Sequence, residues 1–160
     1  AAFDYILAQP STFRRLTLHK IRSIHDLLTK GLVRERGLRT RAVGIIGTQY
    51  EPLDNIHQIQ DAMDMFTHTI NRQEDPFSKA LSSVILLSYV QPFIDGNKRT
   101  ARMLGNAVLL AHNVCPLSYR SVDEVTYKKA TLLFYEQHHI RVFKELFVEQ
   151  FNFAVDQYFR

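Results

Sequence analysis

Apolar residues recur at intervals of three and four along most of the chain, which is the spacing of one face of an α-helix. Ile21, Ile24 and Leu28 mark a first helix, and Gly31 suits a left-handed cap at its C-terminal end. No internal repeat or low-complexity tract interrupts the pattern. The fold is therefore predicted to be all-α.

Three further helices are predicted in the middle of the chain. Asp54 can cap the first, and Asp75 followed by Pro76 supplies an N-cap and a first-turn proline for the second. Pro92 prevents the second helix from continuing, because proline lacks the amide that a helix needs. The apolar stripes are Ile59, Ala62, Met63, Phe66 and Ile70, then Phe77, Ala80, Leu81, Val84, Leu87 and Ser88, then Met103, Ala107 and Leu110.

The last part of the chain predicts two more helices. The sequence SVDE (121–124) has the spacing of a capping box and opens a helix that runs toward Tyr135. A C-terminal helix over about 140–159 then carries aromatic and small residues at helical steps, which we interpret as core: Phe143, Phe147, Phe151, Ala154 and Tyr158.

One segment breaks the helical pattern. RAVGIIGTQYEPL (41–53) contains β-branched residues and glycines without a period of 3.6. It is predicted to form a short β-hairpin flap at about 42–52 within an otherwise helical protein.

The 160 residues are enough for one compact domain, so we expect a single domain over 1–160. A net charge of +4 is too mild to indicate a nucleic-acid-binding protein, but the cations are unevenly placed. Segment 30–41 holds five Lys or Arg against Glu35 alone, and segment 91–102 holds three against Asp95. An anion site would explain both clusters together. Nucleic-acid binding by 30–41 is an alternative, which predicts strongly salt-dependent affinity.

Cysteine usage and hydropathy bear on location. Cys115 is the single cysteine, so no internal disulfide can form, and no Cys/His set has the spacing of a zinc site. No apolar run approaches the length of a membrane span, and no signal peptide is recognisable. We expect a cytoplasmic protein without membrane contact; since it begins without Met, the chain is expected to be a fragment.

The stretch YVQPFIDGNKRTAR (89–102) carries the candidate chemistry. Gly96 lets the backbone turn closely into the N-terminus of the next helix, where unpaired amides and the helix dipole favour an anion. Lys98, Arg99 and Arg102 add positive charge at the same end. Asp95 is then a lone carboxylate among cations. A lone carboxylate beside phosphates usually holds Mg²⁺ through one oxygen. The combination indicates a Mg-nucleotide polyphosphate, and a plain surface turn is the alternative.

The same stretch resembles the signature of the Fic (Fic/Doc, or Fido) family, HxFx(D/E)GNxRxxR. Six residues stand in register and only the leading His is missing. GTQYEP (47–52) is similar to the family's flap, and Asn106 lies where relatives often carry Asn, so the resemblance covers about 14–135. The six residues are Phe93, Asp95, Gly96, Asn97, Arg99 and Arg102.

The resemblance implies a Fic/Doc-type helical bundle that transfers AMP from ATP to a Ser, Thr or Tyr hydroxyl of a target protein. It implies that Asp95 holds Mg²⁺ and that Phe93 and Asn106 are structural anchors. The remaining implied roles are phosphate binding by Gly96, Asn97, Lys98, Arg99 and Arg102, and docking of the target protein by a flap of Gly47, Thr48, Gln49 and Tyr50.

Two departures from the family pattern matter. Lys98 stands where most adenylylating relatives have Gly, and this residue also occurs in the Doc-like branch, which phosphorylates its targets; a Doc-like phosphotransferase is therefore an alternative. Gln91 occupies the position of the general-base His, and a carboxamide has no comparable basicity. Three explanations remain: an introduced inactivating substitution, a natural pseudo-enzyme that binds nucleotide and partner proteins, or recruitment of another base.

Many members of the family are restrained by a helix with the pattern (S/T)xxxE(G/N). No such pattern occurs in these 160 residues. We therefore expect an inhibitory helix, if there is one, to lie upstream of this chain or in a separate partner protein.

Overall fold

The computed structural model describes residues 1–158, and these fold into seven α-helices and one short 3₁₀ helix, which confirms the all-α prediction. Residue 159, the last of the expected C-terminal helix, lies outside the described residues. The elements are α1 (Ala2–Ala8), the 3₁₀ helix η1 (Pro10–Arg14), α2 (Leu18–Thr29), α3 (Ile56–Asn71), α4 (Pro76–Val90), α5 (Asn97–Ala111), α6 (Glu124–Gln137) and α7 (Arg141–Tyr158).

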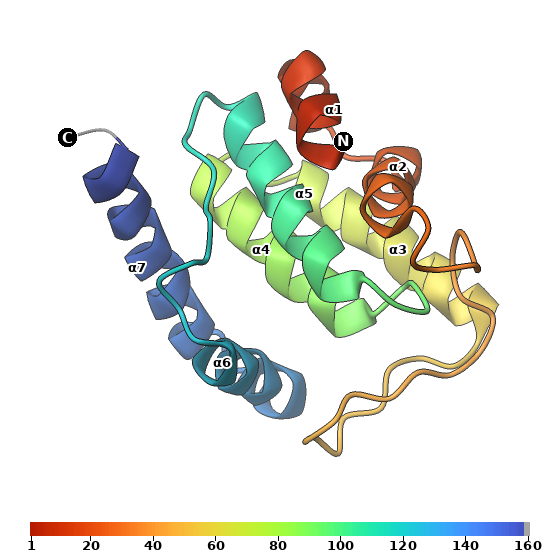
Figure 1. Cartoon of the computed structure of the whole chain (residues 1–160). Helices are drawn as coiled ribbons and strands as arrows, with labels where there is room; N and C mark the ends of the chain where they lie inside the picture. Colours follow the sequence, from red (N-terminus) through yellow and green to blue (C-terminus); the bar gives the residue numbers. More distant parts are fainter. Residues whose placement is uncertain (159–160) are drawn as a thin grey trace.

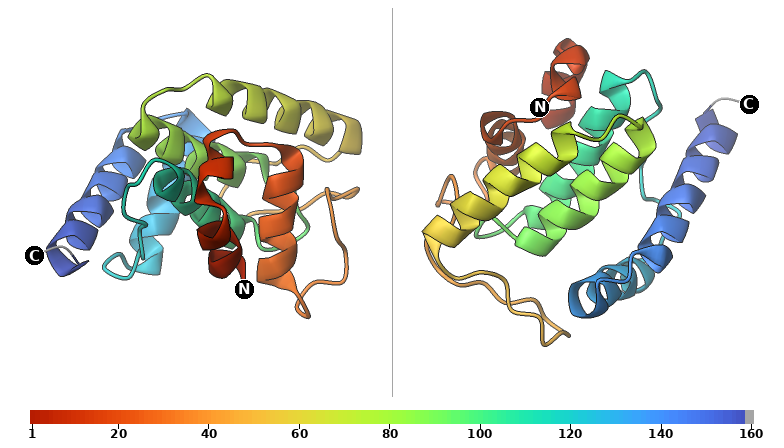
Figure 2. Two further views of the ribbon diagram at one scale, coloured as in Figure 1. Left: turned by 90° about the horizontal axis from the view of Figure 1, so that it is seen from above. Right: turned by 180° about the vertical axis from the view of Figure 1, so that it is seen from behind.

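The antiparallel helices α4 and α5 form the centre of the molecule (Figure 1). α1, η1 and α2 pack against α5, and α3 packs against α4. α6 and α7 form a second pair that lies across the other side of α4, as both views in Figure 2 show. Gly105 allows the central contact, because a Cβ there would lie 2.5 Å from Cγ2 of Val84. The loop between α4 and α5 lies at one end of this central pair.

Several helix ends agree with the local sequence signals. Gly31 follows the end of α2 with a φ of +78°, a conformation that glycine adopts readily. Asp75 caps α4 by accepting from the amide of Ser78 at 2.7 Å, and Pro76 is the first helical residue. α4 ends at Val90, as Pro92 predicted.

Two predicted caps are wrong. Asn55 rather than Asp54 caps α3, where its Oδ1 accepts from the amide of His57 at 2.8 Å. Asp123 rather than Ser121 caps α6, and Ser121 Oγ instead accepts from Gln150 of α7. In both cases a better-placed neighbour of equal capping ability provides the oxygen, which spacing alone cannot decide.

The predicted β-hairpin flap is also wrong. Residues 42–52 run outward and back in two extended limbs (Figures 1 and 2), but within the described residues no backbone hydrogen bond joins the limbs. Side chains tether the segment to helices instead: the hydroxyl of Tyr50 donates to the carbonyl of Tyr89 at 2.7 Å, and that of Thr48 to Glu136 at 2.5 Å. Contacts with α4 and α6 thus replace the ladder of a strand pair, and we call residues 42–52 the flap loop.

Candidate functional site

The side chain of Asn97 braces the loop between α4 and α5. Its Oδ1 accepts from the amide of Phe93 at 2.9 Å and its Nδ2 donates to the carbonyl of Phe93 at 2.8 Å. Left-handed backbone conformations at Gln91 (φ 50°) and Gly96 (φ 81°) make the two sharp turns of the loop. Asn97 therefore closes the loop on itself with its side chain, while its backbone begins α5.

Helix α2 packs against this loop through His25 and Thr29. Phe93 is fully buried and its ring stacks on His25 with centroids 3.9 Å apart. His25 is 1% exposed, and its Nε2 makes a hydrogen bond of 2.9 Å with the carbonyl of Asp95. A Cβ at Gly96 would lie 2.8 Å from Cγ2 of Thr29, so only glycine fits there. The contribution of α2 was not predicted, because His25 looks like any other histidine in the sequence.

A cavity of about 490 Å³ lies at the N-terminus of α5. Gly96 is the N-cap residue and no side chain of residues 1–158 caps the helix, so the first amides of α5 have no side-chain acceptor there. The loop and α5 bring seven of the predicted site residues to this cavity: Gln91, Asp95, Gly96, Asn97, Lys98, Arg99 and Arg102. Positive charge and open amides at a helix N-terminus make the cavity suited to an anion. We call it the anion cavity.

The charged groups of the anion cavity are partly paired with each other. Lys98 makes an ion pair of 2.9 Å with Glu124 at the start of α6. Asp95 accepts from the amide of Gly96 at 2.6 Å, and its other oxygen lies 3.8 Å from a terminal nitrogen of Arg99. The Asp95 side chain is 71% exposed. Its carboxylate is thus accessible to a cation bound beside an anion.

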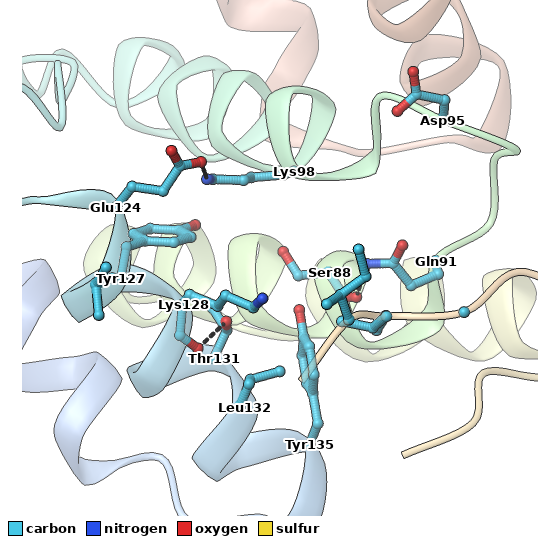
Figure 3. Close-up of a pocket in the computed structure, with 14 residues that line it drawn as sticks. Ser88, Gln91, Asp95, Lys98, Glu124, Tyr127, Lys128, Thr131, Leu132 and Tyr135 are labelled. Atoms are coloured by element: carbon cyan, nitrogen blue, oxygen red, sulfur yellow. Dashed lines mark hydrogen bonds and ion pairs between the residues drawn. The ribbon is translucent and has the colours of Figure 1, made fainter. Parts of the chain in front are cut away.

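A second cavity of about 670 Å³ adjoins the first. The two share Gly44, Gln91, Asp95, Lys98 and Glu124. Figure 3 shows that the far wall of the larger cavity is one face of α6, opposite Ser88 and Gln91. The face of α6 consists of Glu124, Val125, Tyr127, Lys128, Thr131, Leu132 and Tyr135. The helical spacing of these residues could have shown that they share a face, but not what the face covers.

Two buried hydroxyls on the wall of this larger cavity make no hydrogen bond of ordinary length with any residue of 1–158. They belong to Ser88 and Tyr127, which are each 2% exposed. Burial also raises the pKa of Tyr135, on the same wall, to about 12. The larger cavity therefore combines apolar walls with unsatisfied hydroxyls, as a site for a polar organic molecule does.

The two clusters of cations do not form one site. Arg39 is only 2% exposed and turns inward, where its Nε donates to the carbonyl of Gln91 at 2.6 Å and its Nη1 to the carbonyl of Arg41. Burial lowers the pKa of the Arg39 guanidinium. Arg41 pairs with Glu35 on the surface. No cation of 30–41 lines the anion cavity, so the expectation of a joint anion site is wrong.

The side chain of Gln91 is bonded at both ends of its amide. Its Nε2 donates to the carbonyl of Ser88 at 2.7 Å, and its Oε1 accepts from Nδ2 of Asn97 at 3.1 Å. Gln91 also holds a left-handed conformation that Asn, Asp and His adopt more readily. In this chain Gln91 thus ties the end of α4 to the start of α5.

The other predicted residues lie outside both cavities. Gly47, Thr48, Gln49 and Tyr50 form the returning limb of the flap loop, while the residues that reach the cavities are 43–46. Asn106 binds the chain that precedes α6: its Nδ2 donates to the carbonyl of Leu117 at 2.9 Å and its Oδ1 accepts from the amide at 2.8 Å.

This geometry can be compared with known proteins. The model of the Fic/DOC family matches residues 15–109, which include α2, the flap loop, α3, α4, the loop around Gly96 and most of α5. The chain belongs to the Fic/DOC family. The match ends before α6, so it covers every residue of the anion cavity except Glu124 and none of the α6 wall of the larger cavity.

Solved structures show the same fold for this Fic/DOC chain. Fic-1 from C. elegans superposes with a TM-score of 0.78 at 19% identity over 99% of this chain and 48% of that one. A Fic family protein from Desulfovibrio desulfuricans gives 0.78 at 20% identity over 98% and 50%. BepC, a VirB-translocated effector protein of Bartonella tribocorum solved with bound AMPPNP, gives 0.67 at 15% identity over 93% and 83%. The chain thus spans about half the length of the first two relatives.

Two kinds of feature are absent from residues 1–158. No helix in residues 1–158 combines the length and apolar character that crossing a membrane requires. No group of three or more His, Cys, Asp or Glu side chains in the same range is arranged to hold a metal ion.

Proposed function

We propose that this Fic/DOC chain binds Mg-ATP and is an AMP-transferase domain whose activity is impaired by Gln91. The observation that carries the proposal is the open N-terminus of α5, which joins an anion cavity to a larger cavity with unpaired hydroxyls. The two adjoining spaces suit the phosphates and the nucleoside of one nucleotide. The AMPPNP bound to the similarly folded BepC supports the same ligand class.

The phosphate side of the site would use α5. Its first amides and Lys98 would bind the inner phosphates, and Arg99 and Arg102 the outer ones. The exposed carboxylate of Asp95 fits Mg²⁺, which commonly takes one carboxylate and completes its shell with phosphate oxygens and water. When bound, the ion would offset phosphate charge. The lack of a larger ligand cluster in residues 1–158 agrees with a metal that arrives with its nucleotide.

In the proposed reaction a hydroxyl of the target protein attacks the α-phosphorus of ATP. A phosphorus–oxygen bond forms to the hydroxyl oxygen, the bond to pyrophosphate breaks, and the hydroxyl proton must leave to a base. Gln91 cannot accept this proton, and its amide is already bonded to Ser88 and Asn97. Loss of a general base typically slows such a step by about 10²- to 10⁴-fold.

The same contacts of Gln91 favour a second candidate function, a nucleotide-binding module that transfers nothing. A residue that ties α4 to α5 with both ends of its amide serves the structure of the loop rather than the chemistry of a hydroxyl. A Doc-like phosphotransferase, in which the hydroxyl attacks the γ-phosphorus, is a third candidate and would require the opposite seating of the nucleotide.

Calorimetry with ATP and Mg²⁺ tests the shared part of these proposals, with Arg99→Ala as the control. If the unaltered chain gives no more heat than Arg99→Ala, all three candidate functions are wrong, because each requires nucleotide binding. Gln91→His assayed with ATP labelled at the α- or the γ-phosphate then separates them. Transfer of the α label supports AMP transfer, transfer of the γ label supports the Doc-like reaction, and no transfer to any lysate protein supports the silent module.

A further inference from the structure

Arg102 differs from the other cations of the anion cavity. Lys98 pairs with Glu124, and Arg99 lies 3.8 Å from a carboxylate oxygen. Arg102 makes no ion pair with any described residue, and its Nε is buried without a hydrogen-bond partner. A partly buried guanidinium that makes no ion pair needs another source of stabilisation.

Two aromatic rings provide that stabilisation. The Cζ atom of Arg102 lies 3.8 Å from the ring centroid of Tyr127 and 4.8 Å from that of Tyr119. Both distances are within the range of cation–π attraction, which strengthens when the partners are shielded from water. Tyr127 is 2% and Tyr119 is 6% exposed. Arg102 thus packs against two ring faces and makes no ion pair with a carboxylate of residues 1–158, although the charge of Glu124 acts on it from a greater distance.

The rings are themselves held firmly. Tyr119 meets Tyr127 edge to face at 5.8 Å, and Tyr127 meets Phe143 of α7 in the same way at 5.7 Å. Tyr119 has a φ of 57°, which a bulky residue adopts only when its surroundings require it. The paired hydrogen bonds of Asn106 with Leu117 fix the chain that leads to it. The chain before α6, α6 and α7 therefore together fix the two rings that contact the Arg102 guanidinium.

We propose that Tyr119 and Tyr127 are positioning residues, which hold Arg102 ready for the outer phosphates of the nucleotide. The inference rests on the proposed nucleotide binding. A ring that stacks on a guanidinium covers its face but leaves the N–H donors in its plane available for phosphate oxygens. Because the side chain is ordered before the ligand arrives, binding does not have to immobilise it. Neutral rings also do not compete with the phosphates, as a carboxylate would.

Tyr119 offers the cleaner test, because it lines neither cavity whereas Tyr127 lines the larger one. Calorimetry with ATP and with AMP, both with Mg²⁺, compares Tyr119→Leu with Tyr119→Phe, which keeps the ring. We expect Tyr119→Leu to weaken ATP binding by about 3- to 10-fold, the cost of ordering one long side chain. AMP binding should be unchanged, because AMP lacks the outer phosphates. Tyr119→Phe should remain within about twofold of the unaltered chain for both ligands.

A double-mutant cycle shows whether Tyr119 acts through Arg102. In an Arg102→Ala background, Tyr119→Leu should cause no further loss of ATP affinity. The same loss in both backgrounds, no loss in either, or an equal loss for AMP would each overturn the positioning role. If thermal unfolding shows that Tyr119→Leu does not fold, Tyr127→Leu takes its place in the cycle. Because Tyr127 lines the larger cavity, the quantity compared is then the ratio of ATP affinity to AMP affinity. If the unaltered chain binds neither nucleotide, the proposed function fails instead.

Discussion

Replacing Gly96 by Ala tests how closely α2 supports the phosphate loop. The added Cβ meets two obstacles: the backbone has a φ of +81°, and Cγ2 of Thr29 lies 2.8 Å from the Cβ position. A left-handed conformation costs an L-residue about 1–2 kcal/mol. Overpacking of a filled site typically adds about 1–3 kcal/mol. Gly96→Ala should therefore destabilise the protein by about 2–5 kcal/mol.

Gly31 provides a matched control. Its φ is +78°, nearly that of Gly96, but apart from its own chain neighbours no atom of the described residues lies within 4 Å of its Cβ position. Gly31→Ala should therefore show only the backbone cost of about 1–2 kcal/mol. The difference between the two variants measures the contact with α2.

Thr29→Ser identifies the contact itself. It removes the methyl group that meets the added Cβ and keeps the hydroxyl that donates to the carbonyl of His25 at 2.8 Å. In the double variant, Gly96→Ala should cost about as little as Gly31→Ala, once the effect of Thr29→Ser alone is subtracted. Urea unfolding followed by circular dichroism gives the free energies of unfolding of the unaltered chain and of the four variants. The reasoning is refuted if Gly96→Ala costs no more than Gly31→Ala, or if Thr29→Ser brings no relief.

Two other predictions concern charged groups. Glu124→Gln should strengthen ATP binding by about two- to fivefold, because Lys98 no longer has to leave a carboxylate that faces both cavities. The control is Glu149→Gln, an exposed residue outside both cavities, and calorimetry measures the ATP affinity of both variants. An unchanged or lower affinity of Glu124→Gln would contradict the prediction. Hydrogen bonds from Ser78 and Thr126 lower the pKa of the capping carboxylates Asp75 and Asp123 below 3.8 in the folded state. Their contribution is therefore present above the unfolded pKa and lost as the pH falls through the folded value. The free energy of unfolding should decline below about pH 4. The decline should be less steep in the double variant Asp75→Asn/Asp123→Asn, since Asn caps a helix without titrating. Urea titrations at a series of acid pH values would contradict this if the unaltered chain and the double variant lost stability with the same slope.

Local signals account for what was predicted correctly. The helical period, the cap at Asp75, the glycine after α2 and the loop that begins α5 at Asn97 all depend on residues within about four positions of one another. Interactions over such distances survive in any fold that forms the helix. The family signature is local in the same way, which is why seven of the eleven residues that line the anion cavity could be named before their positions were known.

Packing decided the rest, because it joins residues that are far apart in the chain. Thr48 meets Glu136 across 88 positions, so the flap loop is tied to α6 and has no need of strand pairing. Arg39 and Gln91 are separated by 52 positions, and their contact turns a cation of the basic segment inward. A sequence period shows which residues share a helix face but not which partner covers it. The α6 wall and the two rings that hold Arg102 therefore emerged only from the tertiary structure.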